Sequence, residues 1–392
     1  MTKGKRVAVL MCLVGVIMMM VVGTVGCGDS TTTPTETATI TPTEISSQLD
    51  AFKAKVDADV ELWTSPQLGT PPPGPEAVPG KHIVLIPSMA AAEGAAHPIP
   101  VAQEIAEFLG WELTIIDAAG DPVKMNDAVE KAITLKADGV ITIAIDAQII
   151  KGSLEKLKAA GIPCVSFGSE NLDNLCASSE YTVEGKMEQM NLDIGYAVAE
   201  WAWKESGYDM KMIMMTDSEF ISSIQIDQGV RNFVEDCQAA GGDCQILAEA
   251  PFLVNNVMTT AGGLAVQTAR MNPDFNVFWA AYDFALMGMI PALEDAGLTS
   301  NSFAVSVCGN AWNTQMIREG GYQRATVALA YDSAMFSLFD DLNRIFSGQQ
   351  PIGGVAHGCH AKLITTENVP ASGVWNGDID YIPYYQAIWF PQ

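Results

Sequence analysis

The segment Leu109-Gly-Trp-Glu-Leu-Thr-Ile-Ile-Asp-Ala-Ala-Gly-Asp-Pro122 contains a strand and the start of a helix in direct succession. Residues 111–116 are a short apolar run with aromatic and β-branched members, which favours a strand. Asp121 followed by Pro122 is typical of a helix N-cap with proline at the first helical position. A strand that leads directly into a helix is the unit from which parallel α/β sheets are built.

The same succession recurs on both sides of this segment. Strands are predicted in one set and, after a long helix over 186–206, in a second set: 81–87, 111–116, 139–145 and 163–167, then 211–216, 245–250, 277–281 and 303–307. Helical patterns separate them. Two successive sets predict an α/β fold with two Rossmann-like lobes, each a parallel sheet flanked by helices. Ligands of such sheets bind beyond the carboxyl ends of the strands, so functional residues are expected there.

Residues 1–26 have the order of a secretory signal peptide. Basic residues within the first six positions precede an apolar run over 7–25, and small residues end it. Thr24-Val-Gly-Cys27 resembles the bacterial lipobox, whose cysteine becomes the acylated N-terminus after cleavage. An uncleaved N-terminal anchor helix is the alternative. Under both interpretations the rest of the chain lies outside the cytoplasm, and under the first Cys27 attaches it by lipid to the membrane, in the periplasm or at the cell surface.

Two segments separate this signal from the strands. Residues 27–44 are mostly Thr, Pro, Ser, Gly and acidic residues without apolar periodicity, which predicts a disordered spacer. Residues 45–79 begin with an amphipathic stretch and continue as a Pro/Gly-rich run, so a helix followed by an extended arm is expected. Globular sequence is expected to start near Lys81.

The charge balance excludes one class of partner. The chain has 46 acidic against 21 basic residues and a net charge of −25. Nucleic acid is bound through clusters of Lys and Arg, and the sequence has none. We therefore expect no nucleic-acid partner.

The chain has eight cysteines, of which Cys12 belongs to the signal and Cys27 to the proposed anchor. An even number remains in an exported chain, which favours disulfides, although six cysteines permit fifteen pairings. Cys237–Cys244 is the best local pair because it spans a Gly-Gly turn after a helix. Cys164–Cys176 comes next, and Cys308–Cys359 follows by elimination.

No cofactor or metal is expected. Cys359 lies beside His357 and His360, but there is no Cys-x-x-Cys and no second cluster to complete a metal site. No phosphate-binding glycine motif follows a strand. Ser88 is the only candidate nucleophile near His97 and Glu93, and the sequence has no G-x-S-x-G nucleophile elbow. We therefore assign no catalytic residue and do not expect the chain to be an enzyme.

Several ordered stretches resemble the type I periplasmic binding protein family, in the sugar-binding branch that includes ribose-binding protein. They are the opening segment, Ala137-Asp-Gly-Val-Ile-Thr-Ile-Ala-Ile-Asp146, Asn272-Pro-Asp-Phe-Asn-Val-Phe-Trp-Ala-Ala-Tyr-Asp283 and Gly320-Gly-Tyr-Gln-Arg-Ala-Thr-Val327. The resemblance covers roughly residues 80–350.

This resemblance implies two lobes joined by a three-stranded hinge. One lobe would comprise 80–178 plus 330–356, and the other 179–329 plus 357–392. The lobes would close around one small molecule, a sugar or a sugar-like, aromatic, amphipathic solute. The chain, expected as a monomer, would present this ligand to the permease of an ABC importer. A ligand-sensing subunit that feeds a membrane kinase or chemoreceptor is the alternative, and an extracellular hydrolase is disfavoured.

The positions that bind sugars in this family carry different residues in this chain. An Asp-Arg pair after the fourth strand corresponds to Gly168-Ser169, an arginine to Gln228, an asparagine to Tyr282 and an aspartate to Cys308. A family aromatic corresponds to Asn256 or, with a gap, to Phe252. The frame is kept while the charged groups that would bind hydroxyls in pairs are lost.

Residues expected at the strand ends are therefore mostly neutral or aromatic. The candidate ligand-binding residues are Ser88, Glu93, His97, Asp146, Ser169, Phe220, Gln228, Asn256, Tyr282, Asp283, Asn310, Trp312 and Tyr331. Asp283 has a competing role as a cap of the following helix. Trp312 and Tyr331 have a competing role in the core.

Overall fold

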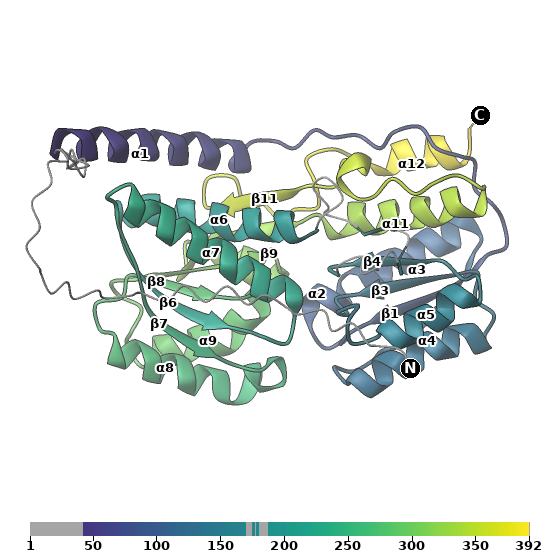
Figure 1. Cartoon of the computed structure of the whole chain (residues 1–392), viewed down its shortest axis with the longest axis horizontal. Coiled ribbons are helices and arrows are strands. Elements are labelled where there is room, and N and C mark those ends of the chain that lie inside the picture. The colour runs from purple at the N-terminus through teal and green to yellow at the C-terminus, as the bar shows by residue number, and fades with distance from the viewer. Residues whose placement is uncertain (1–41, 170–174, 177, 180–186, 392) are drawn as a thin grey trace, which may run out of the picture. The chain divides into compact units, whose positions relative to one another are not determined.

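The computed structural model describes residues 42–169, 175–176, 178–179 and 187–391 (Figure 1). The predicted signal peptide, Cys27 and most of the predicted spacer lie outside this range. Helix α1 spans Pro42–Thr64, so residues 42–44 are helical and do not belong to the spacer. In the part of the chain that is described, no helix is both long and apolar enough to cross a membrane.

The first sheet is parallel, in the order β2-β1-β3-β4-β5. Its strands are β1 (His82–Pro87), β2 (Glu112–Ile115), β3 (Gly139–Ile143), β4 (Cys164–Phe167) and β5 (Ser178–Ser179). Its helices are α2 (Glu93–Ala96), α3 (Pro98–Leu109), α4 (Pro122–Thr134), α5 (Lys151–Ala159) and α11 (Tyr331–Phe346). The predicted N-cap is confirmed, because the Asp121 carboxylate accepts from the Val123 amide at 2.8 Å.

The second sheet has the order β11-β10-β9-β8-β6-β7. Its strands are β6 (Asp209–Thr216), β7 (Asp243–Pro251), β8 (Val277–Ala280), β9 (Phe303–Cys308), β10 (Gln323–Leu329) and β11 (Ala361–Thr365). Its helices are α6 (Met187–Glu205), α7 (Ile221–Ala239), α8 (Gly262–Met271), α9 (Asp283–Asp295) and α10 (Ala311–Arg318). The edge strand β11 is antiparallel to β10, which the sequence did not predict.

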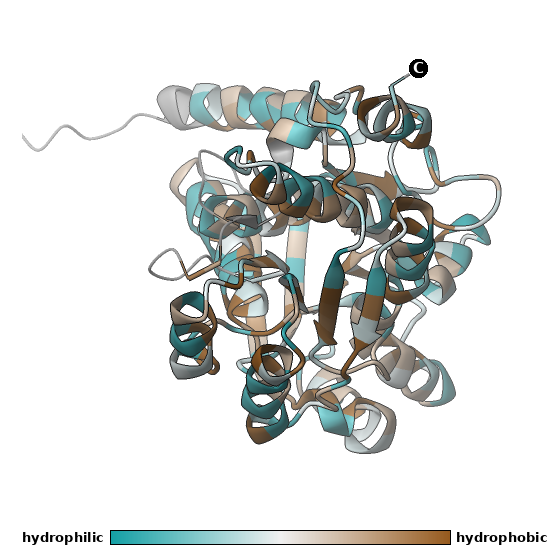
Figure 2. Ribbon diagram, turned by 90° about the vertical axis from the view of Figure 1, so that its right-hand side faces the viewer, coloured by the Kyte–Doolittle hydropathy of each residue, from teal (hydrophilic) through white to brown (hydrophobic). Residues whose placement is uncertain are grey.

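The two α/β lobes therefore follow the predicted fold class. Apolar residues of both sheets are buried under amphipathic helices, and Figure 2 shows hydrophobic strands surrounded by helices with hydrophilic outer faces. Helices α6 and α7 come into backbone contact at Gly195 and Gly229, where any added Cβ would meet a carbonyl oxygen of the other helix.

The C-terminal segment, predicted to belong to the second lobe, contacts both lobes. Helix α12 (Ile382–Trp389) packs on α11, where the Trp389 ring stacks on Phe336 with centroids 5.8 Å apart. Its indole nitrogen donates to Asp340 at 2.8 Å. Residues 357–392 are thus divided, because β11 joins the second sheet whereas α12 completes the apolar cover of a first-lobe helix.

The N-terminal segment also corrects the prediction that globular structure starts near Lys81. Helix α1 covers second-lobe helices, with Phe52 against Trp203 and Phe233 at 5.6 and 5.9 Å. The extended arm over 65–80 then runs along α11 and α12 (Figure 1). There the buried Asn343 amide donates to two carbonyl oxygens of the arm and accepts from the Val78 amide.

Candidate functional site

A cavity of about 150 Å³ lies between the two lobes. Its walls begin where strands end: Ser88 follows β1, Tyr282 follows β8 and Asn310 follows β9. Tyr331 follows β10 at the start of α11. This is the edge at which parallel α/β sheets bind ligands.

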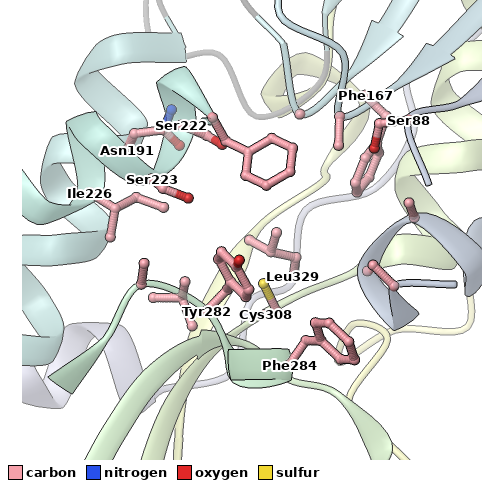
Figure 3. A pocket seen from close by; sticks show the side chains of 18 of the residues that line it. Ser88, Phe167, Asn191, Ser222, Ser223, Ile226, Tyr282, Phe284, Cys308 and Leu329 are labelled. Carbon is pink, nitrogen blue, oxygen red and sulfur yellow. The ribbon is translucent and has the colours of Figure 1, made fainter. Parts of the chain in front are cut away.

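Both lobes supply side chains to the cavity. Figure 3 shows Ser88 and Phe167 on one side, Asn191, Ser222, Ser223 and Ile226 on the other, and Tyr282, Phe284, Cys308 and Leu329 between them. The remaining lining includes Met187, Ile194, Phe220, Val254 and small residues. Among the described residues that line it, none carries a charged side chain.

Carboxylates lie behind this neutral surface and position it. The Tyr282 hydroxyl donates to Asp217 at 2.6 Å, and burial raises the pKa of this aspartate. Asp283 is fully buried, and its carboxylate accepts from the amides of Gly309 and Asn310 at 2.8 and 3.0 Å. Asp283 thus fixes the loop after β9.

The loop after β9 is tightly constrained. Cys308 has a φ of +111°, which a residue with a side chain rarely adopts. A Cβ at Gly309 would collide with Ala328, so this position requires glycine. Burial raises the pKa of the Cys308 thiol to about 12, so it stays protonated at neutral pH and offers the cavity a weakly polar surface.

Asn310 lines the cavity and has a buried side-chain acceptor without a partner among the described residues. The residue is 3% exposed, lines the cavity and has its backbone held by Asp283. Its side-chain Oδ1 is buried without a hydrogen-bond partner among the described residues. A buried acceptor without a partner costs free energy, and a ligand that donates to it would remove that cost.

The family described as periplasmic binding protein domain matches residues 85–350. The chain belongs to this family. It is a family of solute-binding proteins and not of enzymes, and its members act outside the cytoplasm. No curated protein sequence matches the chain.

Solved structures share the fold of this periplasmic binding protein. A sugar ABC transporter subunit from Rhodobacter sphaeroides superposes with a TM-score of 0.63 at 18% identity, covering 74% of this chain and 99% of that one. An ABC transporter solute-binding protein from Bacillus halodurans with bound myo-inositol gives 0.64 at 16% identity, covering 74% and 96%. One from Actinobacillus succinogenes with bound D-allose gives 0.64 at 17%, covering 74% and 99%.

Five predicted site residues line the cavity of this periplasmic binding protein: Ser88, Phe220, Tyr282, Asn310 and Tyr331. The competing core role of Tyr331 is also present, since it is 4% exposed and its ring packs on Phe167 at 5.4 Å.

Predicted residues from the loop after β1 have other partners. Glu93 accepts from the Ala311 amide of the second lobe at 2.7 Å, so it joins the lobes instead of lining the cavity. His97 packs against Tyr331, and its Nε2 pairs with Asp332 at 2.9 Å. This hydrogen bond is the main cause that raises the pKa of His97.

Three predicted residues of the second lobe lie outside the lining of the cavity. Gln228 is exposed on α7 and donates to Asn232, because the helix starts at Ile221 and turns Ser222 and Ser223 toward the cavity instead. Trp312 packs against the second-lobe core. Asn256 lies in a short helical turn, from which Val254 reaches the cavity.

The last three predicted residues have local structural roles. Asp146 accepts from the Gln148 amide at 2.8 Å and borders a smaller adjoining hollow. Ser169 is buried and its hydroxyl donates to the Ile145 carbonyl. Asp283 lies within α9, and its carboxylate holds the loop after β9, so the suggested cap of its own helix is replaced by a contact with a different strand end.

Sequence reasoning missed Phe167, Asn191, Ile194, Phe284 and Leu329 in the lining. Most of these are apolar, and an apolar residue at a strand end or on a helix has the same sequence signal as a core residue. Asn191 could have been found as a lone amide on the buried face of α6, where it donates to Gln225.

One of the three predicted disulfides is present. Cys237–Cys244 is a disulfide, as predicted. Cys164 and Cys176 are thiols in contact at 2.8 Å, so that predicted bond is absent. The Cys308–Cys359 pairing is also wrong, because Cys308 lines the cavity as a thiol and Cys359 receives a contact from the Ser333 hydroxyl. Within the described ranges no group of side chains forms a metal site.

Proposed function

We propose that this chain is a solute-binding protein that closes its two lobes on one small uncharged molecule and delivers it to the permease of an ABC importer. The observation that carries this proposal is the cavity at the strand ends, because residues of both lobes share its walls. Membership of the periplasmic binding protein family supports the same role.

Closure follows from the placement of the lining. A ligand that touches Phe167 in the first lobe and Ser223 in the second gains both contacts only when the lobes approach each other. Such differential contact shifts the population toward the closed arrangement. The hinge would lie where β10 leads into α11 and where residues 347–360 return to β11.

The proposal also includes a transporter partner, a membrane anchor and the bounds of the two lobes. Similar structures include components named as ABC transporter subunits, which supports an importer as partner. A lipid on Cys27 would hold this monomer at the membrane, and the segment before α1 would act as its tether. The lobes would comprise 80–178 with 330–356 and 179–329 with β11, while α12 belongs to the first.

Small-angle scattering tests the clamp. The chain without residues 1–26 is measured alone and after incubation with a small-molecule extract of its host. A decrease in the radius of gyration is expected with the extract and not with its solvent. An unchanged scattering curve, with a bound molecule seen by mass spectrometry, would show that the lobes do not close on their ligand.

A further inference from the structure

We propose that the ligand is a single-ring, uncharged and largely apolar molecule that carries a hydrogen-bond donor, and not a polyhydroxylated sugar. This inference rests on the proposed function, since it names the ligand class of the same cavity.

Aromatic rings from both lobes form the apolar walls. Phe167 and Tyr331 face the cavity from the first lobe, with ring centroids 5.4 Å apart. Phe220 and Tyr282 face it from the second lobe, 6.2 Å apart and edge to face. A flat ring held between such groups gains stacking and edge contacts in addition to burial.

The size of the cavity favours a single ring. Its volume is about 150 Å³. An engineered apolar cavity of about the same volume takes up benzene and stays free of water. The match in size and in lining chemistry points to a molecule built on one ring.

The lining of the cavity is mostly apolar, which disfavours a polyol. Among the described lining residues the uncharged polar side chains are those of Ser88, Asn191, Ser222, Ser223, Asn310 and Tyr331, besides the Tyr282 hydroxyl that already donates to Asp217 and the Cys308 thiol. Asn191 already donates its amide to Gln225. A buried hydroxyl without a partner weakens binding about tenfold. A molecule with a hydroxyl on every carbon would leave several such groups unmatched.

The side-chain oxygen of Asn310 determines the polar group that we expect on the ligand. Asn310 Oδ1 is buried without a partner in the described part of the chain, and Asp283 holds the backbone of Asn310 in place. A small rotation of the Asn310 amide toward the cavity would let a ligand O–H or N–H satisfy this oxygen. A ring that lacks a donor would leave it unsatisfied and would bind less tightly.

Calorimetric titration of the chain without residues 1–26 tests the proposal, with phenol, toluene, myo-inositol and D-allose as probes. Phenol is expected to bind at one site per chain, toluene about tenfold more weakly, and the two polyols without measurable heat. Asn310→Ala is expected to abolish the preference for phenol over toluene. Asn301→Ala, an exposed loop substitution, is the matched control and is expected to keep it.

Circular dichroism establishes that each variant is folded before titration. Tighter binding of either polyol than of phenol would overturn the ligand class while leaving the solute-binding function intact. An unchanged preference in Asn310→Ala, or no binding of phenol and toluene, would also overturn it. The proposed function fails separately, if the host extract yields no bound molecule of any class.

Discussion

The Glu93 carboxylate of the first lobe accepts a hydrogen bond from the Ala311 amide of the second lobe at 2.7 Å. Ala311 is the first residue of α10, where free amides and the helix dipole favour a negative charge. The bond joins the two lobes beside the cavity, whose lining includes the neighbouring Gly94 and Asn310. It therefore contributes to holding the lobes together.

Replacing Glu93 by glutamine should loosen this contact. Glu93→Gln removes the charge that strengthens the bond, so the closed arrangement is expected to be less populated at a given ligand concentration and ligand affinity to fall about threefold to tenfold. Scattering and calorimetry measure the two effects. Glu104→Gln, exposed on α3, is the control and should leave both unchanged. Equal radii of gyration for both variants and the parent chain would remove the latch role of Glu93.

Asp227 should make stability depend on pH. Burial raises its pKa to about 7 from an ordinary 3.8, and its carboxylate accepts from the Trp279 indole at 2.7 Å. A raised pKa means that the folded chain binds the proton more tightly, so this contribution to stability is present at low pH and is lost as pH rises through about 7.

Asp227→Asn should remove that loss. At pH 8 the variant is expected to exceed the parent chain in free energy of unfolding by about 1–4 kcal/mol, with a smaller difference at pH 5. Urea denaturation across this interval measures it. Asp274→Asn on the surface is the control. Parallel pH profiles for Asp227→Asn and the parent would contradict the assignment.

The arm over 65–80 should be needed for stability. Asn343→Ala leaves the carbonyls of Pro75 and Glu76 and the amide of Val78 without their partner in α11. A decrease of about 2–4 kcal/mol in the free energy of unfolding is expected. Asn301→Ala provides the baseline for an exposed asparagine. If the two variants unfold at the same urea concentration, the arm does not stabilise the body.

The disulfide should be detectable by alkylation. Under denaturing conditions without reductant, a chain lacking residues 1–26 with Cys27 replaced should be alkylated at Cys164, Cys176, Cys308 and Cys359 only. Prior reduction should add Cys237 and Cys244 and lower stability by about 2–3 kcal/mol, because the bond closes a short loop. Any other labelling pattern would contradict this connectivity.

Local signals predicted the fold, since each depends on neighbouring residues. Asp121 caps its helix as predicted, and Gly110 and Gly297 adopt positive φ just after the ends of α3 and α9. Contacts between distant segments left no such signal. The arm binds Asn343 mainly through backbone carbonyls, which every residue has, and α12 meets α11 through rings that any core could use.

The site was predicted only as far as strand ends could be placed. Tyr282 and Asn310 follow strands directly and line the cavity. Gln228 lies outside the cavity because α7 starts at Ile221, and each residue along a helix turns the side chain by about a quarter of a circle. Glu93 lies at the right edge, but its partner is a backbone amide that the sequence cannot reveal.

Native mass spectrometry tests the solute-binding role most directly. The chain without residues 1–26 is exposed to a small-molecule extract of its host beside Ser223→Trp, which fills the cavity from α7. One small molecule per chain is predicted on the parent, recovered chemically unchanged, and none on Ser223→Trp. A parent chain that emerges without a bound molecule, or that converts the molecule into a product, would contradict a solute-binding clamp.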